Sequence, residues 1–308
     1  MTNIRDYLRS LPAETICYRP NPGNGGDALI AQATFQLFRE CRVRYRVIGP
    51  QDDLKDRVLV YGGGGNLVAN YRPCSDFVRA HHRDAKKLVL FPHTIDDHED
   101  LLRELGANVD IICRERTSFN HVIRHAGKAN VYLMDDLAFN LDVARTFDEI
   151  DRHPRFLLDR SSLKESVRLV KQQLRYRSAL LKRRRHLKAG ESSGPRRLNC
   201  FRTDCERTSV EIPPDNVDLS HLFMSPRVTT EYPALIEAWA HVTTHRVLSY
   251  MKPFDEIHTN RLHLGIAGIL IGQKVYYYPN AYWKNESVYQ HSMKGRFTKV
   301  TWIAPDRP

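Results

Sequence analysis

Short apolar runs followed by glycine-rich or polar turns recur along the first half of the chain. We predict strands at residues 14–18, 45–48, 57–61, 87–91, 110–113 and 129–134. Helical segments are predicted between several of them, at residues 28–38, at 101–105 and shortly after 118. Strands that alternate with helices in this way are typical of repeated β-α units and a parallel sheet.

A second β-α series is predicted near the C-terminus. Its strands are expected at residues 197–202, 246–250 and 274–278, and its helices at 233–240 and from Leu264 to Ile271. The two series repeat an architecture and not a sequence. We therefore expect an N-terminal Rossmann-like domain at residues 1–145, a basic helical connector at 146–195 and a C-terminal Rossmann-like domain at 196–308.

The connector carries most of the positive charge of the protein. The formal net charge of the chain is +11, and residues 164–188 hold ten Lys or Arg but one acid, which gives 10 − 1 = +9. Apolar residues recur there at helical spacing, with basic residues between them. This segment could lie on an anionic membrane surface, or it could be a solvated helix that connects two domains. The rest of the chain is nearly balanced, which argues against a nucleic-acid-binding surface spread over the whole fold.

Composition favours a cytoplasmic protein. No apolar run among the 308 residues reaches the roughly 18–20 residues that a membrane span needs. The first ten residues lack the continuous apolar core of a secretory signal. Six scattered cysteines without a Cys-x-x-Cys pair indicate reduced thiols.

Two glycine-rich turns follow predicted strands in the first half. One contains Asn24, Gly26 and Asp27, and the other contains Gly63 and Gly64. Neither has the spacing of a dinucleotide fingerprint or a P-loop. In an open parallel sheet, both turns would lie at the carboxyl ends of strands, where ligands bind. Asp27 is expected at the N-cap of the next helix, where it either binds a ligand or only caps.

His93 is the next candidate, because Pro92 and His93 are expected to end the strand at 87–91. It would then point to the same edge of the sheet. Asp135 and Asp136, and the acids at 96–100, also follow predicted strands. No compact His, Asp and Glu cluster stands out as a metal site, although these acids leave one open.

Cationic residues occur in both halves. Arg114 follows the strand at 110–113, and Arg261 and His263 come just before the small, apolar helix that begins at Leu264. A guanidinium group presents a rigid fork that fits a phosphate or carboxylate. Histidine can transfer a proton near neutral pH. The alternative, that these residues only cap a core helix, remains open.

Taken in order, these motifs resemble the polysaccharide pyruvyl transferase family. The resemblance is carried by Asn24-Gly-Gly-Asp27, the glycine run Gly62–Gly65, Arg114-Glu115 ahead of Ser118, Arg261-Leu262-His263 and Lys284. It covers roughly residues 14–142 and 196–292. Glu115 stands where many members carry Asp, and the basic segment has no match in the family pattern.

The resemblance implies a GT-B-like α/β fold of two Rossmann-like domains with parallel sheets, and an active site in the inter-domain cleft. It implies phosphoenolpyruvate as co-substrate, with no cofactor and no metal. The acceptor would be a sugar of an exopolysaccharide or capsule repeat unit, lipid-linked in our interpretation, and the product a cyclic pyruvate ketal. If the repeat is built on a lipid carrier, the basic segment could dock the enzyme at the inner face of the cell membrane.

The expected roles follow from the chemistry of phosphoenolpyruvate. Arg114 and Arg261, one from each half, would clamp its phosphate and carboxylate. His263 would protonate its methylene carbon, and Asp27 or His93 would bind or deprotonate a sugar hydroxyl. The other residues expected to bind substrate are Asn24, Gly26, Gly63, Gly64, Leu262 and Lys284.

Two rival functions remain at this stage. A glycosyltransferase of the same architecture would place the diphosphate of a nucleotide-sugar in the same cationic cleft. A non-catalytic protein could instead bind nucleic acid or anionic lipid through residues 164–188, although this would leave the glycine turns and Arg261-Leu262-His263 unexplained.

Overall fold

Two parallel sheets form the framework of the protein. The computed structural model describes residues 3–21, 23–149, 174, 176–181, 183, 187, 194–208, 210–224 and 232–304. The larger sheet has the order β2-β1-β3-β5-β6-β7, with β4 paired to the far end of β5, and all its described pairings are parallel. The smaller sheet has the order β11-β10-β9-β8 and is also parallel. The predicted α/β class with two Rossmann-like parallel sheets is confirmed.

The first half contains seven strands among the described residues. They are β1 (Ile16–Arg19), β2 (Tyr45–Val47), β3 (Val58–Tyr61), β4 (Gly64–Leu67), β5 (Lys87–Ile95), β6 (Val109–Cys113) and β7 (Asn130–Leu133). The helices are α1 (Ile4–Ser10), α2 (Gly25–Glu40), α3 (Pro73–His81), α4 (Glu99–Glu104), α5 (Arg116–His125), the 3-10 helix η1 (Leu137–Asn140) and α6 (Val143–Asp148).

The second half repeats the pattern with fewer strands. Its strands are β8 (Arg197–Cys200), β9 (Glu256–Thr259), β10 (Lys274–Tyr277) and β11 (Val300–Trp302). The helical elements are α8 (Leu219–Leu222), η4 (Pro233–Leu235), α10 (Ile236–Met251), α11 (Leu262–Leu270), α12 (Lys284–Val288) and the π-helical η5 (Tyr289–Met293).

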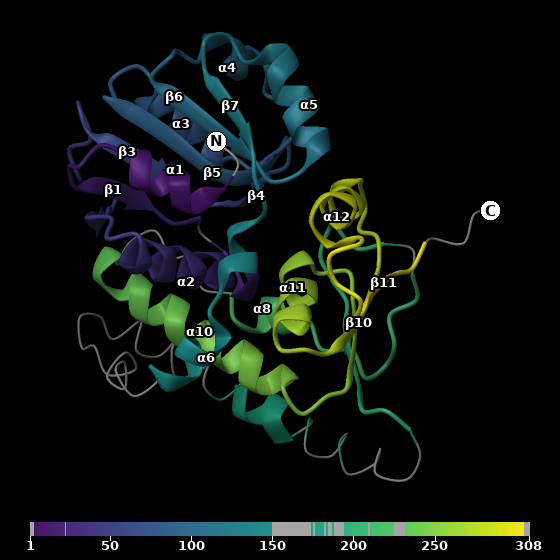
Figure 1. The fold of residues 1–308 in the computed structure, drawn as a ribbon. Coiled ribbons are helices and arrows are strands. Elements are labelled where there is room, and N and C mark those ends of the chain that lie inside the picture. Colours follow the sequence, from purple (N-terminus) through teal and green to yellow (C-terminus); the bar gives the residue numbers. More distant parts are fainter. Residues whose placement is uncertain are drawn as a thin grey trace.

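The strands of the larger sheet are apolar on both faces, as a covered parallel sheet requires. In β3, Val58 and Val60 pack into the core formed with α2, whereas Leu59 and Tyr61 pack into a second core beneath α3, α4 and α5. Figure 1 shows α2 and α10 on one side of this sheet and α4 and α5 on the other.

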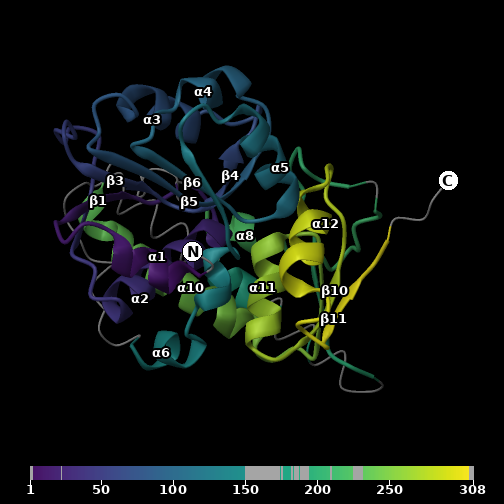
Figure 2. The same cartoon turned by 45° about the horizontal axis from the view of Figure 1, so that its top comes forward.

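Helix α10 joins the two halves, because it packs on α2 of the first half and not on its own sheet alone. Figure 2 shows the same arrangement from a second direction. Polar contacts accompany the apolar ones: Glu237 accepts hydrogen bonds from Arg39 Nη1 at 2.5 Å and from Tyr45 Oη at 3.0 Å. One continuous apolar core therefore runs from the first sheet through α2, α10 and α11 to the second sheet.

Three of the predictions about strands are wrong. Residues 246–250, predicted as a strand, are the last turns of α10, and the strand lies at β9 instead. A short apolar run fits both periods, and here Val247, Leu248 and Met251 belong to the buried helical stripe that begins at Ile236.

The other two errors concern the edge of the first sheet. β5 does not end at Pro92 but continues to Ile95. Its register with β6 shifts between Leu90 and His93, so the missing N–H of Pro92 falls at an irregularity and not within a regular ladder. The glycine run is not wholly a loop either, because its second half begins β4, which pairs with this extension of β5.

Most of the basic segment 164–188 lies outside the described residues. Those of its residues that are described are helical. Arg183 donates to the carbonyl oxygen of Ser249 at 2.8 Å, and its guanidinium lies over the ring of Tyr250, so this part of the segment contacts α10. Neither of the two functions predicted for the segment is tested by these contacts.

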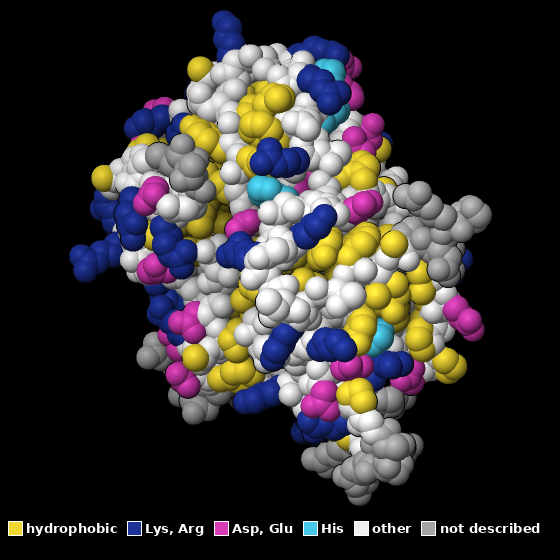
Figure 3. Space-filling model, turned by 45° about the vertical axis from the view of Figure 1, so that its right-hand side comes forward, with side chains coloured by type: hydrophobic (Ala, Val, Ile, Leu, Met, Phe, Trp, Pro, Cys, Tyr) yellow, Lys and Arg dark blue, Asp and Glu magenta, His cyan; other side chains and the backbone are white. Residues whose placement is uncertain are grey.

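Two observations concern membrane-spanning helices and the charge on the surface. Within the part of the chain that the structure describes, no helix has the length and apolar character needed to span a membrane. On the face shown in Figure 3, Lys and Arg side chains are scattered among acidic and apolar ones and do not form one broad basic patch.

Candidate active site

A cavity of about 230 Å³ lies where the two halves meet, and both halves line it. Seven residues predicted from the sequence are in its lining: Asn24, Asp27, Arg114, Arg261, Leu262, His263 and Lys284. Its other lining residues are Asn21, Gly23, Gly65, Asn66, Tyr71, Pro73, Arg202, Asp204, Glu206, Ser220 and Met224. Asn24 and Lys284 are 284 − 24 = 260 positions apart in the sequence. Motifs that are distant in the sequence therefore meet at one site.

The order of the larger sheet explains why the glycine turns reach this cavity. β2 lies on one side of β1, and β3 lies on the other. The direction in which successive strands are added to the sheet therefore reverses between β1 and β3. In doubly wound sheets, ligands bind at the carboxyl ends of the strands that flank such a switch point. Asn21, Asn24 and Asp27 follow β1 at this position, and Gly65 and Asn66 lie in β4, which follows β3.

Asp27 enters the cavity from the first turn of α2. The N-cap of this helix is Asn24 and not Asp27, which corrects the prediction. The two residues form a capping box: the Gly26 amide donates to Asn24 Oδ1 and the Asn24 amide donates to Asp27 Oδ2, both at 2.8 Å. Asn21 Nδ2 donates to the other carboxylate oxygen at 2.8 Å. Burial nevertheless raises the pKa of Asp27 above its ordinary value.

Asp136 connects the cationic residues of the two halves. Its Oδ2 accepts a hydrogen bond from Arg114 Nη1 at 2.8 Å and lies 3.3 Å from His263 Nε2. Both Arg114 and Asp136 are almost completely buried. Burial acts to raise the pKa of Asp136, but the neighbouring His263 and Arg114 hold it well below its usual value. Asp136 is thus a buried carboxylate that orients a guanidinium and an imidazole at once.

Arg261 is the N-cap residue of α11, and Leu262 and His263 form the start of that helix. Its Nη2 donates to Asp204 at 3.0 Å and also to Asp218. Within the described residues, its buried Nε has no hydrogen-bond partner. A buried donor without a partner is costly, so this N–H marks where a bound anion would be stabilised.

Lys284 is the first residue of α12 and is paired with Glu206. Glu206 also accepts from Arg202 Nη1 at 2.6 Å and from Tyr71 Oη at 3.0 Å. Burial lowers the pKa of Lys284 to about 8, although the charge of Glu206 acts in the other direction. The same cations keep the pKa of Glu206 below its ordinary value despite its burial.

Two glycines are required here by close approach. A Cβ at Gly26 would lie 2.6 Å from His263 Nδ1, and one at Gly65 would lie 2.8 Å from Arg114 Nη2. Only glycine leaves room for these side chains where they stand. Gly26 thus shapes the site through His263 without lining the cavity.

Three predicted residues, Gly63, Gly64 and His93, do not line the cavity. A Cβ at Gly63 would meet the carbonyl oxygen of Pro92 at 2.9 Å, and one at Gly64 would meet Asn21 Nδ2 at 2.5 Å. His93 is fully buried within β5, and burial lowers its pKa to about 3. Its side chain contacts the site through Asn66, whose Oδ1 is 2.9 Å from His93 Nε2. The neutral, enclosed imidazole is a structural partner of Asn66, which corrects the expectation that His93 points to the cavity.

Several residues that line the cavity, or that contact its lining, were not predicted as ligands. Asp136, Arg202, Asp204 and Glu206 are the most important of them, because they hold the predicted cations in place. A signal was present for two of them: Asp136 follows β7 and Arg202 follows β8, both near the carboxyl ends of strands.

Comparison with known proteins agrees with the arrangement of these motifs. The model of the polysaccharide pyruvyl transferase family matches residues 24–282. The chain belongs to this family. The match begins at the capping box of α2 and includes the Arg261-Leu262-His263 motif.

The protein is also similar to a solved structure. The crystal structure of an uncharacterized protein from Klebsiella pneumoniae superposes with a TM-score of 0.70 and 25% sequence identity. The match covers 95% of this chain and 94% of that chain. No curated protein matches the sequence. The family assignment indicates a pyruvyltransferase enzyme, and the fold is shared along nearly the whole length of both chains.

Proposed function

We propose that the protein transfers the enolpyruvyl group of phosphoenolpyruvate to two hydroxyls of one sugar, which forms a pyruvate ketal and releases phosphate. The observation that carries this proposal is the convergence of Asp27, Arg114, Arg261, His263 and Lys284 on one small cavity. Phosphoenolpyruvate bears a phosphate and a carboxylate on a three-carbon frame, so it needs several cations within a short distance.

The cations of the cavity suit such a ligand because carboxylates already fix their directions. Arg114 uses Nε on Thr94 and Nη1 on Asp136, which leaves Nη2 toward Gly65 at the cavity. Arg261 uses Nη2 on Asp204 and Asp218, which leaves its Nε. We assign these two free donor positions, together with Lys284, to the phosphate and carboxylate. Donors that are oriented before binding lose little entropy when the substrate arrives.

The first chemical step in this proposal is protonation of the methylene carbon by His263. The C=C bond becomes a methyl group, and the adjacent carbon becomes electrophilic. Asp136 faces Nε2 of the imidazolium and keeps the ring oriented, so the proton that moves to the methylene carbon is the one on Nδ1. A sugar hydroxyl then adds to the electrophilic carbon and loses its proton.

Asp27 is the proposed base for the hydroxyl groups. Its raised pKa makes the carboxylate a better proton acceptor than an ordinary surface aspartate, and it stands on the same cavity wall as Asn24. The second hydroxyl displaces phosphate and closes the ring. One hydroxyl proton replaces the proton given by His263, and the other leaves with the products.

Two single substitutions test the assignment. Arg261→Ala and His263→Ala should abolish phosphate release from phosphoenolpyruvate in the presence of acceptor, because each removes a donor from the cavity. Circular dichroism should show an unchanged fold. Arg103→Ala is the matched control, since Arg103 is an exposed arginine whose ion pair among the described residues is with Asp100, three positions earlier. Wild-type rates from both cavity variants would refute the mechanism.

A thermal-shift titration separates this proposal from the glycosyltransferase alternative. Phosphoenolpyruvate should raise the Tm of the wild-type protein, and a nucleotide-sugar should not, because a ligand stabilises only the state that binds it. The opposite pattern would favour the rival. Membership of the pyruvyl transferase family supports the first outcome.

We further propose that the acceptor is lipid-linked and that the basic segment docks the enzyme at the inner membrane face. The charge of residues 164–188 supports this. Replacing Lys182, Arg184, Arg185 and Lys188 by Gln should abolish co-sedimentation with anionic vesicles and leave the rate on a soluble saccharide unchanged. Equal sedimentation of both proteins would remove the membrane role.

A further inference from the structure

Two histidines and a glutamate come together on the helical layer that covers the outer face of the first sheet. Glu99 is the first residue of α4, and His121 and His125 lie one turn apart on α5. One ligand atom from each side chain can be chosen so that all three lie within 4.8 Å of one another. None of the three lines the candidate active site.

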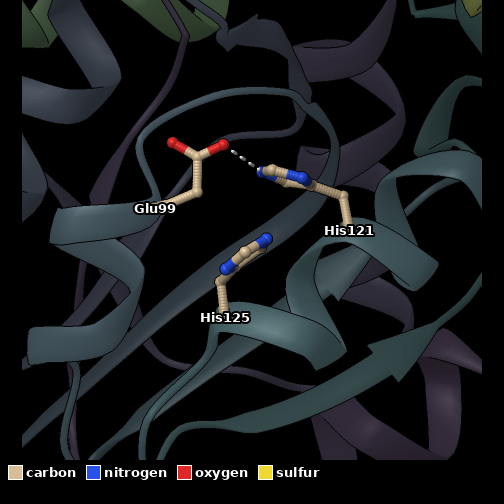
Figure 4. Close-up of side chains that lie close together, drawn as sticks. All are labelled: Glu99, His121 and His125. Carbon is tan, nitrogen blue, oxygen red and sulfur yellow. Dashed lines mark ion pairs between the residues drawn. The ribbon is translucent and has the colours of Figure 1, made fainter.

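Figure 4 shows that the three side chains point into a common space from two different helices. His121 Nε2 is 3.9 Å from Glu99 Oε1, and the two imidazole ring centres are 5.0 Å apart. The His121 side chain is 18% exposed and that of Glu99 is 40% exposed, so an ion can reach the space directly from solvent.

The donor set is that of a zinc site. Zinc takes imidazole nitrogen at about 2.0–2.1 Å and carboxylate oxygen at about 2.0–2.2 Å, in a tetrahedral arrangement. Those bond lengths place neighbouring ligand atoms about 3.3 Å apart. The present separations thus need to contract by about 1.5 Å at most, which requires small rotations of the histidine side chains as well as of the exposed Glu99. Three protein ligands leave a fourth position for water. Two imidazoles disfavour Mg²⁺ and Ca²⁺, which require oxygen ligands.

The loop before α4 provides an orienting contact. The carbonyl oxygen of Asp97 lies 2.9 Å from His121 Nε2. This is the same nitrogen that faces Glu99, so an ion bound through Nε2 would take the place of the carbonyl contact.

We propose that Glu99, His121 and His125 form a zinc site. Its ligands join the start of α4 to the last turn of α5, so a bound ion cross-links the two helices. The ion would stabilise the fold there and take no part in the reaction at the cavity. The proposal does not depend on the enzymatic function, because it concerns other residues on another face.

Zinc titration of the full-length protein tests the proposal. Protein freed of metal with a chelator and kept under a non-thiol reductant is titrated with ZnCl₂ by calorimetry. We expect one zinc per chain with a Kd in the micromolar range or tighter. At free zinc of about 100 Kd, the Tm should rise by roughly 5 °C. Glu99→Gln and His125→Gln should each weaken binding at least tenfold, and the double variant His121→Gln/His125→Gln should bind no zinc.

Two controls keep the outcome unambiguous. His81→Gln changes another histidine in the last turn of a helix, outside the cluster, and should leave the affinity unchanged. Cobalt(II) in place of zinc should give the visible spectrum of a nitrogen and oxygen site without a thiolate charge-transfer band, because Cys205 is an exposed thiol that could compete. Millimolar affinity in the wild type, undiminished binding in the double variant or a thiolate band would each overturn the proposal.

Discussion

Replacing Asp136 by Asn tests the electrostatic link between the two halves directly. Asp136 Oδ1 accepts from the Ala138 amide at 2.9 Å, and Oδ2 faces both Arg114 Nη1 and His263 Nε2. Asn can retain the first contact and has nearly the same shape. It removes the negative charge and presents either a neutral oxygen or an NH₂ group to two donors.

The magnitude follows from the burial of this pair. At an effective dielectric constant of about 20, opposite charges about 3 Å apart attract by roughly 5–6 kcal/mol, which desolvation of both ions largely offsets. Removing one partner leaves the other charge buried, at a cost of about 3–5 kcal/mol. Arg114 is 1% exposed, so we expect Asp136→Asn to lower the free energy of unfolding by about 3–5 kcal/mol.

The kinetic effect should accompany the loss of stability. Without Asp136, the His263 imidazolium loses its counter-charge and its fixed orientation, so kcat for phosphate release should fall by at least about 100-fold. Urea unfolding and continuous phosphate detection at a temperature where both proteins are folded measure the two effects separately.

Asp135 supplies the matched control on the neighbouring residue. Its carboxylate pairs with Arg296 and Ser292 at the surface, and its side chain is 34% exposed. Exposed pairs contribute about 0–1 kcal/mol, so Asp135→Asn should change stability little and leave kcat intact. If the two variants lose equal stability, or if Asp136→Asn turns over at the wild-type rate, the reasoning about the buried link is wrong.

Two further predictions concern Lys284, which lines the cavity, and Gly26, which lies close to His263. Because burial lowers the pKa of Lys284 to about 8, its charge is present below that pH and lost above it; the KM for phosphoenolpyruvate should therefore rise between pH 7 and 9.5. In Lys284→Arg, which stays charged throughout, the KM should be flat over this range, and a flat profile in the wild type would show that Lys284 does not bind the substrate as a cation. Gly26→Ala should reduce kcat at least about tenfold, because the new methyl group would lie 2.6 Å from His263 Nδ1 and displace a side chain that we assign to proton transfer. Gly25→Ala is the comparison, since its Cβ meets nothing closer than 3.4 Å, and similar rates for the two variants would contradict the role given to Gly26.

The features that could be predicted from the sequence are local ones. A strand that ends in Gly, Asn and Asp before a helix is a short-range pattern, and it places Asn24 and Asp27 correctly at the start of α2. The polar Arg261-Leu262-His263 before a small-residue helix is equally local, and α11 begins there. The N-cap lies three positions before the predicted one, at Asn24 and not at Asp27, because both residues can cap and only the backbone decides.

The features that escaped prediction depend on distant partners. Asp136 and His263 are 127 residues apart, and Lys284 and Glu206 are 78 residues apart, so nothing in either neighbourhood indicates the pairing. The metal candidate was missed for the same reason, since Glu99 and His121 meet only when α4 and α5 pack together. The helix at 246–250 was mistaken for a strand because five residues are too few to distinguish the two periods.

The packing of α10 on α2 has a consequence for how substrates enter and leave. Rotating one half away from the other would expose the apolar surfaces of both helices and separate Glu237 from Arg39. We therefore expect exchange through local motion at the cavity mouth, with no wide hinge opening between the halves. The radius of gyration measured by small-angle X-ray scattering should then be the same with and without phosphoenolpyruvate. The arginines of both halves would already be in their binding positions before the substrate enters.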